Sequence, residues 1–132
     1  MLTGLYQPTS GEIRVNGVNA IKAPELARRQ MGLCPQYDVL YEELTCEEHL
    51  RLFAVVKNCP PRKVSSEVTH VLDQLGLSFK RKVLSKDLSG GMKRRLSLGM
   101  AMINNTKILI LDEPTRLVFC FCFGSNLTPF CF

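Results

Sequence analysis

The stretch that decides the fold begins Leu88-Ser89-Gly90-Gly91-Met92, continues as a basic amphipathic segment, and ends Lys107-Ile108-Leu109-Ile110-Leu111-Asp112-Glu113-Pro114-Thr115. A serine is a good helix N-cap, and the two glycines leave the first helical turn without side chains, so its backbone N–H groups are open to an anion such as a phosphate. The second half is a short apolar run, typical of a buried parallel strand, that ends in two carboxylates. Because ligands of α/β sheets bind beyond the carboxyl ends of the strands, the stretch predicts a site at the rim of a sheet. One carboxylate there can hold Mg²⁺ while its neighbour orients or deprotonates a water.

Together the two halves resemble the signature and Walker B motifs of ATP-binding cassette (ABC) proteins. The resemblance implies that Ser89, Gly90 and Gly91 bind the γ-phosphate of an ATP molecule held by an opposing domain. It also implies that Asp112 is the Mg²⁺-linked aspartate and Glu113 the catalytic glutamate. The competing interpretation is a glycine-started core helix followed by a buried strand that ends in a solvated acidic pair.

A second segment with the same resemblance lies near the start of the chain. The pattern predicts a short helix over Pro24–Gln30, a compact apolar run over Met31–Cys34, and a loop that contains Gln36. In ABC proteins this glutamine contacts the attacking water and the Mg²⁺, here through water, and joins the ATPase core to a helical subdomain that faces the membrane part. The competing interpretation is a solvated loop glutamine.

Between these segments the sequence predicts a compact helical insert. Thr45 and Glu48 form a capping box, and the helix that they open runs to about Lys57 with an apolar face. A second helix starts near Arg62 and closes at Gly76. Its apolar stripe comprises Val64, Val68, Val71, Leu72 and Leu75, while His70 lies off the stripe and is predicted to be solvated. Gln36 and Ser89 are 53 positions apart, which leaves no room for a long coiled coil.

The helix after Ser89 is predicted to bury one side and expose the other. The predicted buried residues are Met92, Leu96, Gly99, Met100 and Ile103. The predicted solvent-facing residues are Lys93, Arg94 and Arg95. Met92 stands where the family often has Gln, and with Pro35–Leu40 this resembles subfamily A, the lipid-exporting group.

The first residues match the ABC segment that follows the phosphate-binding helix. Met1–Leu5 is predicted to be the end of a helix, and residues 12–17 alternate polar and apolar before an Asn-Gly turn, which predicts a strand and a hairpin. The P-loop pattern G-x-x-x-x-G-K-[ST] does not occur in the sequence. By the resemblance, that loop would lie a few residues before Met1.

Composition excludes several classes of protein. The chain has 132 residues with 45% apolar and 22% charged residues, which suits one globular domain rather than a disordered segment. Its net charge of +5 is scattered, and the absence of Trp and of aromatic residues among the basic groups predicts no nucleic-acid partner. The six cysteines include no C-x-x-C pair and no zinc-ligand spacing, so reduced thiols in the cytosol are expected. No apolar run reaches the roughly eighteen residues of a membrane span, so membrane domains of a transporter would lie outside this chain.

The composition changes abruptly after Thr115. Five of the seven Phe and three of the six Cys lie beyond this position, and Arg116 is the only charged residue there. The tail resembles unrelated coding sequence joined in the middle of a domain; the alternative is a real β-strand or a membrane-surface segment. The expected division is therefore a partial ATPase core over 1–44, a helical subdomain over 45–103, a Walker B strand over 104–115 and a divergent tail over 116–132.

These patterns predict an α/β protein with part of a P-loop NTPase fold, an incomplete core sheet and a complete helical subdomain. By the resemblance it is part of an ABC ATP-binding domain that uses ATP and Mg²⁺, pairs with a second such domain and with transmembrane domains, and acts at the cytoplasmic face of a membrane in transport, plausibly of lipid. The chain alone, without the P-loop lysine, is predicted to be cytosolic and inactive as an ATPase. Two alternatives are a non-enzymatic product that occupies and poisons a full-length partner, and a soluble DNA-repair type of ABC ATPase, against which the 53-residue spacing argues.

Overall fold

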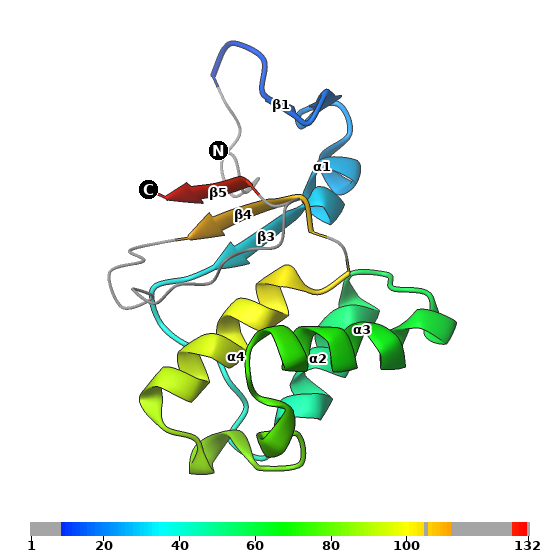
Figure 1. The fold of residues 1–132 in the computed structure, drawn as a ribbon. Helices are drawn as coiled ribbons and strands as arrows, with labels where there is room; N and C mark the ends of the chain where they lie inside the picture. Colours follow the sequence, from blue (N-terminus) through cyan, green and yellow to red (C-terminus); the bar gives the residue numbers. More distant parts are fainter. Residues whose placement is uncertain (1–8, 105, 112–127, 132) are drawn as a thin grey trace.

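The structure, a computed structural model, describes residues 9–104, 106–111 and 128–131. Its elements, in chain order, are β1 (Arg14–Val15), β2 (Val18–Asn19), α1 (Pro24–Gln30), β3 (Met31–Cys34), α2 (Cys46–Val56), α3 (Pro61–Gln74), the 3-10 turns η1 (Ser78–Lys80) and η2 (Ser85–Asp87), α4 (Gly90–Met102), β4 (Ile108–Leu111) and β5 (Thr128–Cys131). Figure 1 shows the three-stranded sheet above a group of helices, with the β1–β2 hairpin and α1 on its other side. The predicted α/β class is confirmed, and the helix end predicted at Met1–Leu5 lies outside the described residues.

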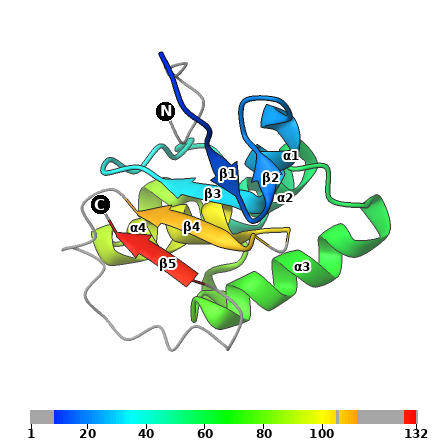
Figure 2. The same ribbon diagram turned by 90° about the horizontal axis from the view of Figure 1, so that it is seen from above.

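The sheet is parallel, in the order β3-β4-β5. In its register Met31 pairs with Ile108 and Cys34 with Leu111, so β3 and β4 end at the same edge. Figure 2 shows the three strands running side by side in the same direction. The predicted buried parallel strand is confirmed, because the last three residues of β4 are buried on both faces of the sheet.

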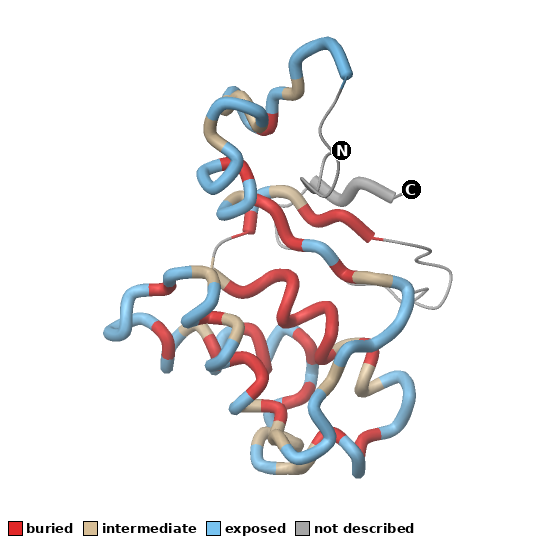
Figure 3. The backbone as a smooth tube through the Cα atoms, turned by 180° about the vertical axis from the view of Figure 1, so that it is seen from behind, coloured by how far each residue is buried: buried red, intermediate tan, exposed pale blue. Residues whose placement is uncertain are grey.

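The two faces of the sheet belong to two different clusters of apolar side chains. Leu109 and Leu111 join the large cluster that α2, α3 and α4 bury beneath the sheet. Ile110 packs on the other face with Met31 and with Val15 of the hairpin. The alternation follows from the two-residue period of a strand. Figure 3 shows the continuous buried stretch along α4 under the sheet.

The helices under the sheet form for the reasons that the sequence predicted. At the start of α2, Thr45 Oγ1 accepts a hydrogen bond from the backbone N–H of Glu48, and Thr45 N–H donates to the Glu48 carboxylate at 2.8 Å, which completes the predicted capping box. The predicted stripe of α3 is buried in full. Gly76 ends this helix with φ +62°, a left-handed conformation that glycine adopts without strain.

The predicted hairpin is also confirmed. Arg14 pairs with Asn19 and Val15 with Val18, and the two residues between them are Asn16 with φ +48° and Gly17 with φ +82°. Two positive φ angles define a tight turn of the kind that favours Asn-Gly.

One prediction about α4 is wrong. Arg94 does not face solvent but is 6% exposed, while Lys93 and Arg95 are half-buried. The reason is tertiary: the chain that leaves β3 crosses this side of α4, and Arg94 bonds to its backbone. The predicted buried residues Leu96, Gly99, Met100 and Ile103 are buried, whereas Met92 is half-buried.

The tail contributes β5, whose backbone lies parallel to β4 with Thr128 opposite Ile108 and Cys131 opposite Leu111. No helix in the part of the chain that the structure describes is both long and apolar enough to cross a bilayer.

Candidate functional site

The first part of the candidate site is the sheet edge where β3 and β4 end. Gln36 follows two residues after β3, and its side chain is exposed. Asp112 and Glu113 follow directly after Leu111, the last residue of β4, and lie outside the described residues. Since Cys34 and Leu111 are opposite each other in parallel strands, β3 and β4 end at the same edge of the sheet. The grouping of Gln36 with Asp112 and Glu113 at this edge stays a prediction.

The second part is the first turn of α4. Ser89 is its N-cap, with Ser89 Oγ accepting a hydrogen bond from Met92 N–H at 3.3 Å. A Cβ atom added at Gly90 or Gly91 would meet nothing within 4 Å, so no side chain or backbone of another described element crowds these two positions. The positive end of the helix dipole lies at the same place. An open turn of this kind can receive an anionic oxygen such as that of a phosphate.

These two parts both lie along α4. In Figure 1, α4 begins well below the sheet and ends directly under it. Its last turns pack on β3, where a Cβ at Gly32 would lie 2.0 Å from the carbonyl oxygen of Ala101. At 1.5 Å per residue, Gly90 lies roughly 16 Å along the helix axis from Ala101. The end of β3 lies nearer the first turn, because Cys34 Sγ is 3.9 Å from Ser97 Oγ and Arg94 bonds to the carbonyl oxygen of Pro35. The open turn and the sheet edge are therefore adjoining surfaces along the first two turns of α4.

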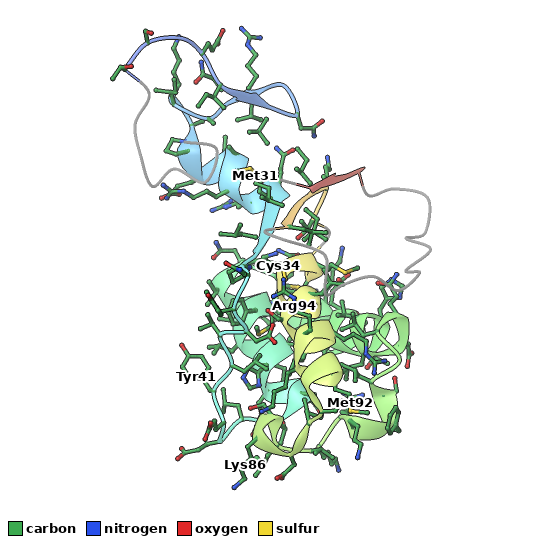
Figure 4. All side chains as sticks on the ribbon, turned by 90° about the vertical axis from the view of Figure 1, so that its left-hand side faces the viewer. Met31, Cys34, Tyr41, Lys86, Met92 and Arg94 are labelled. Carbon is green, nitrogen blue, oxygen red and sulfur yellow. The ribbon has the colours of Figure 1, made fainter. Side chains whose placement is uncertain are left out.

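The loop that carries Gln36 is fixed to α4 by a buried arginine. Arg94 Nη1 donates to the carbonyl oxygen of Pro35, and to Asp38 Oδ1 at 3.1 Å. In Figure 4 Arg94 lies close to Cys34, at the level where the chain leaves β3. This contact was not predicted from the sequence. Position 94 precedes the buried Ser97 and Leu98 by three and four residues, but this period does not show that an arginine there finds a backbone partner.

A buried histidine holds the other end of the same loop. His49 is fully buried, and its Nε2 accepts a hydrogen bond from Tyr41 N–H at 2.9 Å. Its Nδ1 lies 2.9 Å from the carbonyl oxygen of Thr45, so the ring carries its proton on Nδ1. The Tyr41 and His49 rings stack at 6.0 Å between centroids. No sequence pattern indicates this role of His49, whereas His70, predicted to be solvated, is exposed.

The described residues of the candidate site fit ATP and Mg²⁺ only in part. The open turn of α4 suits a phosphate, and the amide oxygen of Gln36 suits a hard cation or its water shell. Within the described ranges, no three His, Cys, Asp or Glu side chains lie together as a metal site, and the carboxylates predicted for Mg²⁺ fall outside those ranges. The buried thiol nearest the edge is Cys34, whose pKa is raised by desolvation, and its Sγ lies 3.9 Å from Ser97 Oγ. A raised pKa keeps this thiol protonated and unreactive at neutral pH.

Comparison with known protein families gives a match to the ABC transporter model over residues 1–116. Among curated proteins, the phospholipid-transporting ATPase ABCA3 of Rattus norvegicus is 48% identical over 115 residues, which are 87% of this chain and 7% of that protein. ABC transporter A family member 1 of Dictyostelium discoideum is 44% identical over the same share of this chain and 13% of its own length. The chain thus spans a small part of each relative that it resembles.

Solved structures agree at the level of the fold. The ATP binding subunit of an ABC transporter superposes with a TM-score of 0.71 at 34% identity, covering 86% of this chain and 47% of that one. CbiO1 of Clostridium perfringens, part of the ABC transporter complex cbiONQ, gives a TM-score of 0.75 at 24% identity, covering 87% of this chain and 47% of that one, and is similar in fold alone.

Proposed function

Since the chain belongs to the ABC transporter family, with relatives in subfamily A, we propose that it serves as part of an ATP-binding domain that couples ATP binding and hydrolysis to transport across a membrane. The observation that carries this proposal is the first turn of α4, which is capped by Ser89 and uncovered at Gly90 and Gly91. The relatives named as phospholipid-transporting favour a lipid substrate for the whole transporter. Its place is the cytoplasmic face of a membrane, with transmembrane domains as partners.

In this proposal, the two candidate surfaces act in two different ATP sites formed between two domains. Ser89, Gly90 and Gly91 receive the γ-phosphate of an ATP molecule bound mainly by the opposing domain. At the sheet edge, Gln36 and Asp112 serve the Mg²⁺ ion, and Glu113 positions the attacking water. Bound Mg²⁺ supplies neutralisation of the phosphate charge that develops during hydrolysis. Donors already in place when that charge develops lower the barrier without reorganisation.

A direct test is ATP-dependent pairing between this chain and a complete ABC ATP-binding domain that contributes its own P-loop. The expected result is a heterodimer in light scattering with ATP and Mg²⁺ that is lost in Ser89→Arg, because the arginine fills the open turn. Ser65→Arg, at an exposed position on α3, is the matched control and leaves pairing intact. Pairing that does not depend on ATP, or that survives Ser89→Arg, contradicts the proposal.

The sequence of this chain contains no P-loop, so we expect the chain alone to bind ATP weakly and not to hydrolyse it. Purified chain and its Glu113→Gln variant are expected to give the same background phosphate release. ATP hydrolysis by the chain that disappears in Glu113→Gln would show that these residues suffice for the reaction.

The same open turn favours a second, non-enzymatic role that is compatible with the first. A chain with an intact signature turn can occupy the opposing half-site of a full-length transporter and block it. Addition of the chain to such a transporter is then expected to lower ATP turnover in proportion to the amount bound. Ser89→Arg is expected to abolish the inhibition.

A further inference from the structure

Arg94 lies at the junction between the two surfaces of the proposed site. It belongs to α4, four residues after Gly90, which is about 6 Å along the helix axis at 1.5 Å per residue. Its guanidinium reaches the backbone on one side of Gln36, at Pro35, and the side chain of Asp38 on the other. Gln36 is therefore flanked on both sides by groups bonded to the helix that carries the open turn.

The environment of Arg94 is costly for a residue with only a packing role. Its side chain is 8% exposed, and its ion-pair partner Asp38 is 27% exposed at the side chain. Within the described residues, Arg94 Nε is buried without a hydrogen-bond partner. A buried guanidinium with an unmet donor is destabilising relative to an apolar side chain of similar volume. The interactions that offset this cost are the two contacts of Arg94 with the Gln36 loop.

We infer that Arg94 is a positioning residue that fixes the Gln36 loop to the signature helix, so that Gln36 and the first turn of α4 move as one unit. The inference rests on the proposed function for its biological meaning, because that function gives Gln36 and the turn of α4 their roles toward Mg²⁺ and phosphate. Its physical content does not depend on nucleotide. Release of Arg94 frees the loop while the rest of α4 stays packed under the sheet.

Arg95 offers a matched comparison on the same helix. It is the next residue, is half-buried, and donates from Nη1 to the carbonyl oxygen of Leu75 at 3.2 Å, at the end of α3. It makes a hydrogen bond to backbone as Arg94 does, but toward another helix. Loss of Arg95 therefore reports on helix packing, and loss of Arg94 on the Gln36 loop.

The experiment is ¹⁵N relaxation on the full chain without nucleotide, for the wild type, Arg94→Met, Arg94→Lys, Asp38→Asn and Arg95→Met. In Arg94→Met the order parameters of residues 36–39 are expected to fall from about 0.85 to below about 0.6, while those of α3 and α4 are unchanged. Arg94→Lys, which keeps one charged donor, is expected to restore part of the loss, and Asp38→Asn to give an intermediate loss. Arg95→Met is expected to leave residues 36–39 unchanged.

Unchanged loop order in Arg94→Met overturns the inference, as does a loosening of the loop that Arg95→Met reproduces equally. If Arg94→Met does not fold, the Asp38→Asn and Arg94→Lys variants provide the test, because they keep the helix and remove single contacts. Unchanged order of residues 36–39 in both variants then overturns the inference. A second arm measures ATP-dependent pairing with a complete ABC ATP-binding domain, where Arg94→Met is expected to weaken pairing at least fivefold and Arg95→Met less than twofold. Failure of pairing in the wild type counts against the proposed function and leaves the loop measurement as the separate test of Arg94.

Discussion

Lys57, at the end of α2, has its ammonium group inside the molecule. Its Nζ donates to the carbonyl oxygens of Ala101 and Ile103 and to Thr106 Oγ1, the last at 2.9 Å. In return, Asn104 Nδ2 donates to the carbonyl oxygen of Lys57 at 2.7 Å. Thr106 Oγ1 donates to the same carbonyl oxygens of Ala101 and Ile103, so the end of α4 is satisfied by two side chains, and a cation there also complements the negative end of the helix dipole. Lys57 thus connects α2 with the turn that leads from α4 into β4.

The burial of Lys57 predicts an unusual rise of stability with pH. Desolvation lowers the pKa of Lys57 to about 8 from the ordinary 10.5. Between these values the folded chain holds Lys57 neutral while the unfolded chain binds the proton, so the free energy of unfolding increases with pH across that window, by about 2–3 kcal/mol from this group. Urea unfolding at pH 7.5, 9 and 10 is expected to show this increase in the wild type relative to Lys57→Met. Desolvation raises the pKa values of the buried Cys34 and Cys46, which therefore act with the opposite sign, and their effect cancels in this difference. Parallel pH profiles of the two proteins would contradict the prediction.

Glu47, in the first turn of α2, is a group whose charged form the fold stabilises, and its effect appears at acidic pH. Arg81 and Arg51 both donate to its carboxylate, Arg81 at 2.7 and 2.9 Å, and they hold the pKa of Glu47 at about 2 against an ordinary 4.5. Its stabilisation is complete above about pH 4.5 and is lost as the pH falls toward 2. Glu47→Gln is expected to lower the free energy of unfolding by about 1–2 kcal/mol at pH 7 and by much less near pH 2. The exposed Glu43→Gln is the control and should change stability little at either pH. A loss of stability in Glu47→Gln that is equal at both pH values would contradict the prediction, because it would show that packing and not charge accounts for the contribution of Glu47.

At the scale of elements, β3 and α4 approach each other more closely than ordinary side chains allow. Gly32 permits this approach, because its missing Cβ would meet the backbone of Ala101 rather than a movable side chain. Gly99, further back on α4, faces the flexible end of Leu75 instead. This contact sets the distance between α4 and the sheet, and it therefore also sets the position of the first turn of α4.

Alanine substitutions at the glycines are expected to rank by what surrounds them. Gly32→Ala should lower the free energy of unfolding by about 3 kcal/mol, because strand and helix must separate. Gly99→Ala should cost about 1 kcal/mol, since Leu75 can change its rotamer. Gly90→Ala, at an open position, should leave stability within about 0.5 kcal/mol. Chemical denaturation measures all three, and a Gly32→Ala protein as stable as the wild type would contradict the packing described here.

In the whole molecule, the sheet separates the helices beneath it from the hairpin cluster above it. Its lower face rests on the helices that carry the open turn of α4, and its upper face packs on the hairpin cluster of Val15, Met31 and Ile110. β3 and β4 end at the same edge of the sheet, and Gln36 follows two residues after β3. In the proposed function, a second domain supplies the phosphate for the open turn of α4. The pairing experiment with Ser89→Arg tests this consequence at the scale at which it arises.

The sequence by itself determined the elements whose causes are local. The capping box at Thr45, the Asn16-Gly17 turn, the stripe of α3 and the serine cap of α4 each depend on residues within a few positions of one another, and all were predicted. The sequence also indicated the family, because the Ser-Gly-Gly and Asp-Glu motifs are specific at their spacing. Tertiary structure alone decided the burial of Arg94, the role of His49 and the connection made by Lys57. Each depends on a contact with backbone that another element brings near, and helical periodicity cannot show which polar side chain will find such a partner.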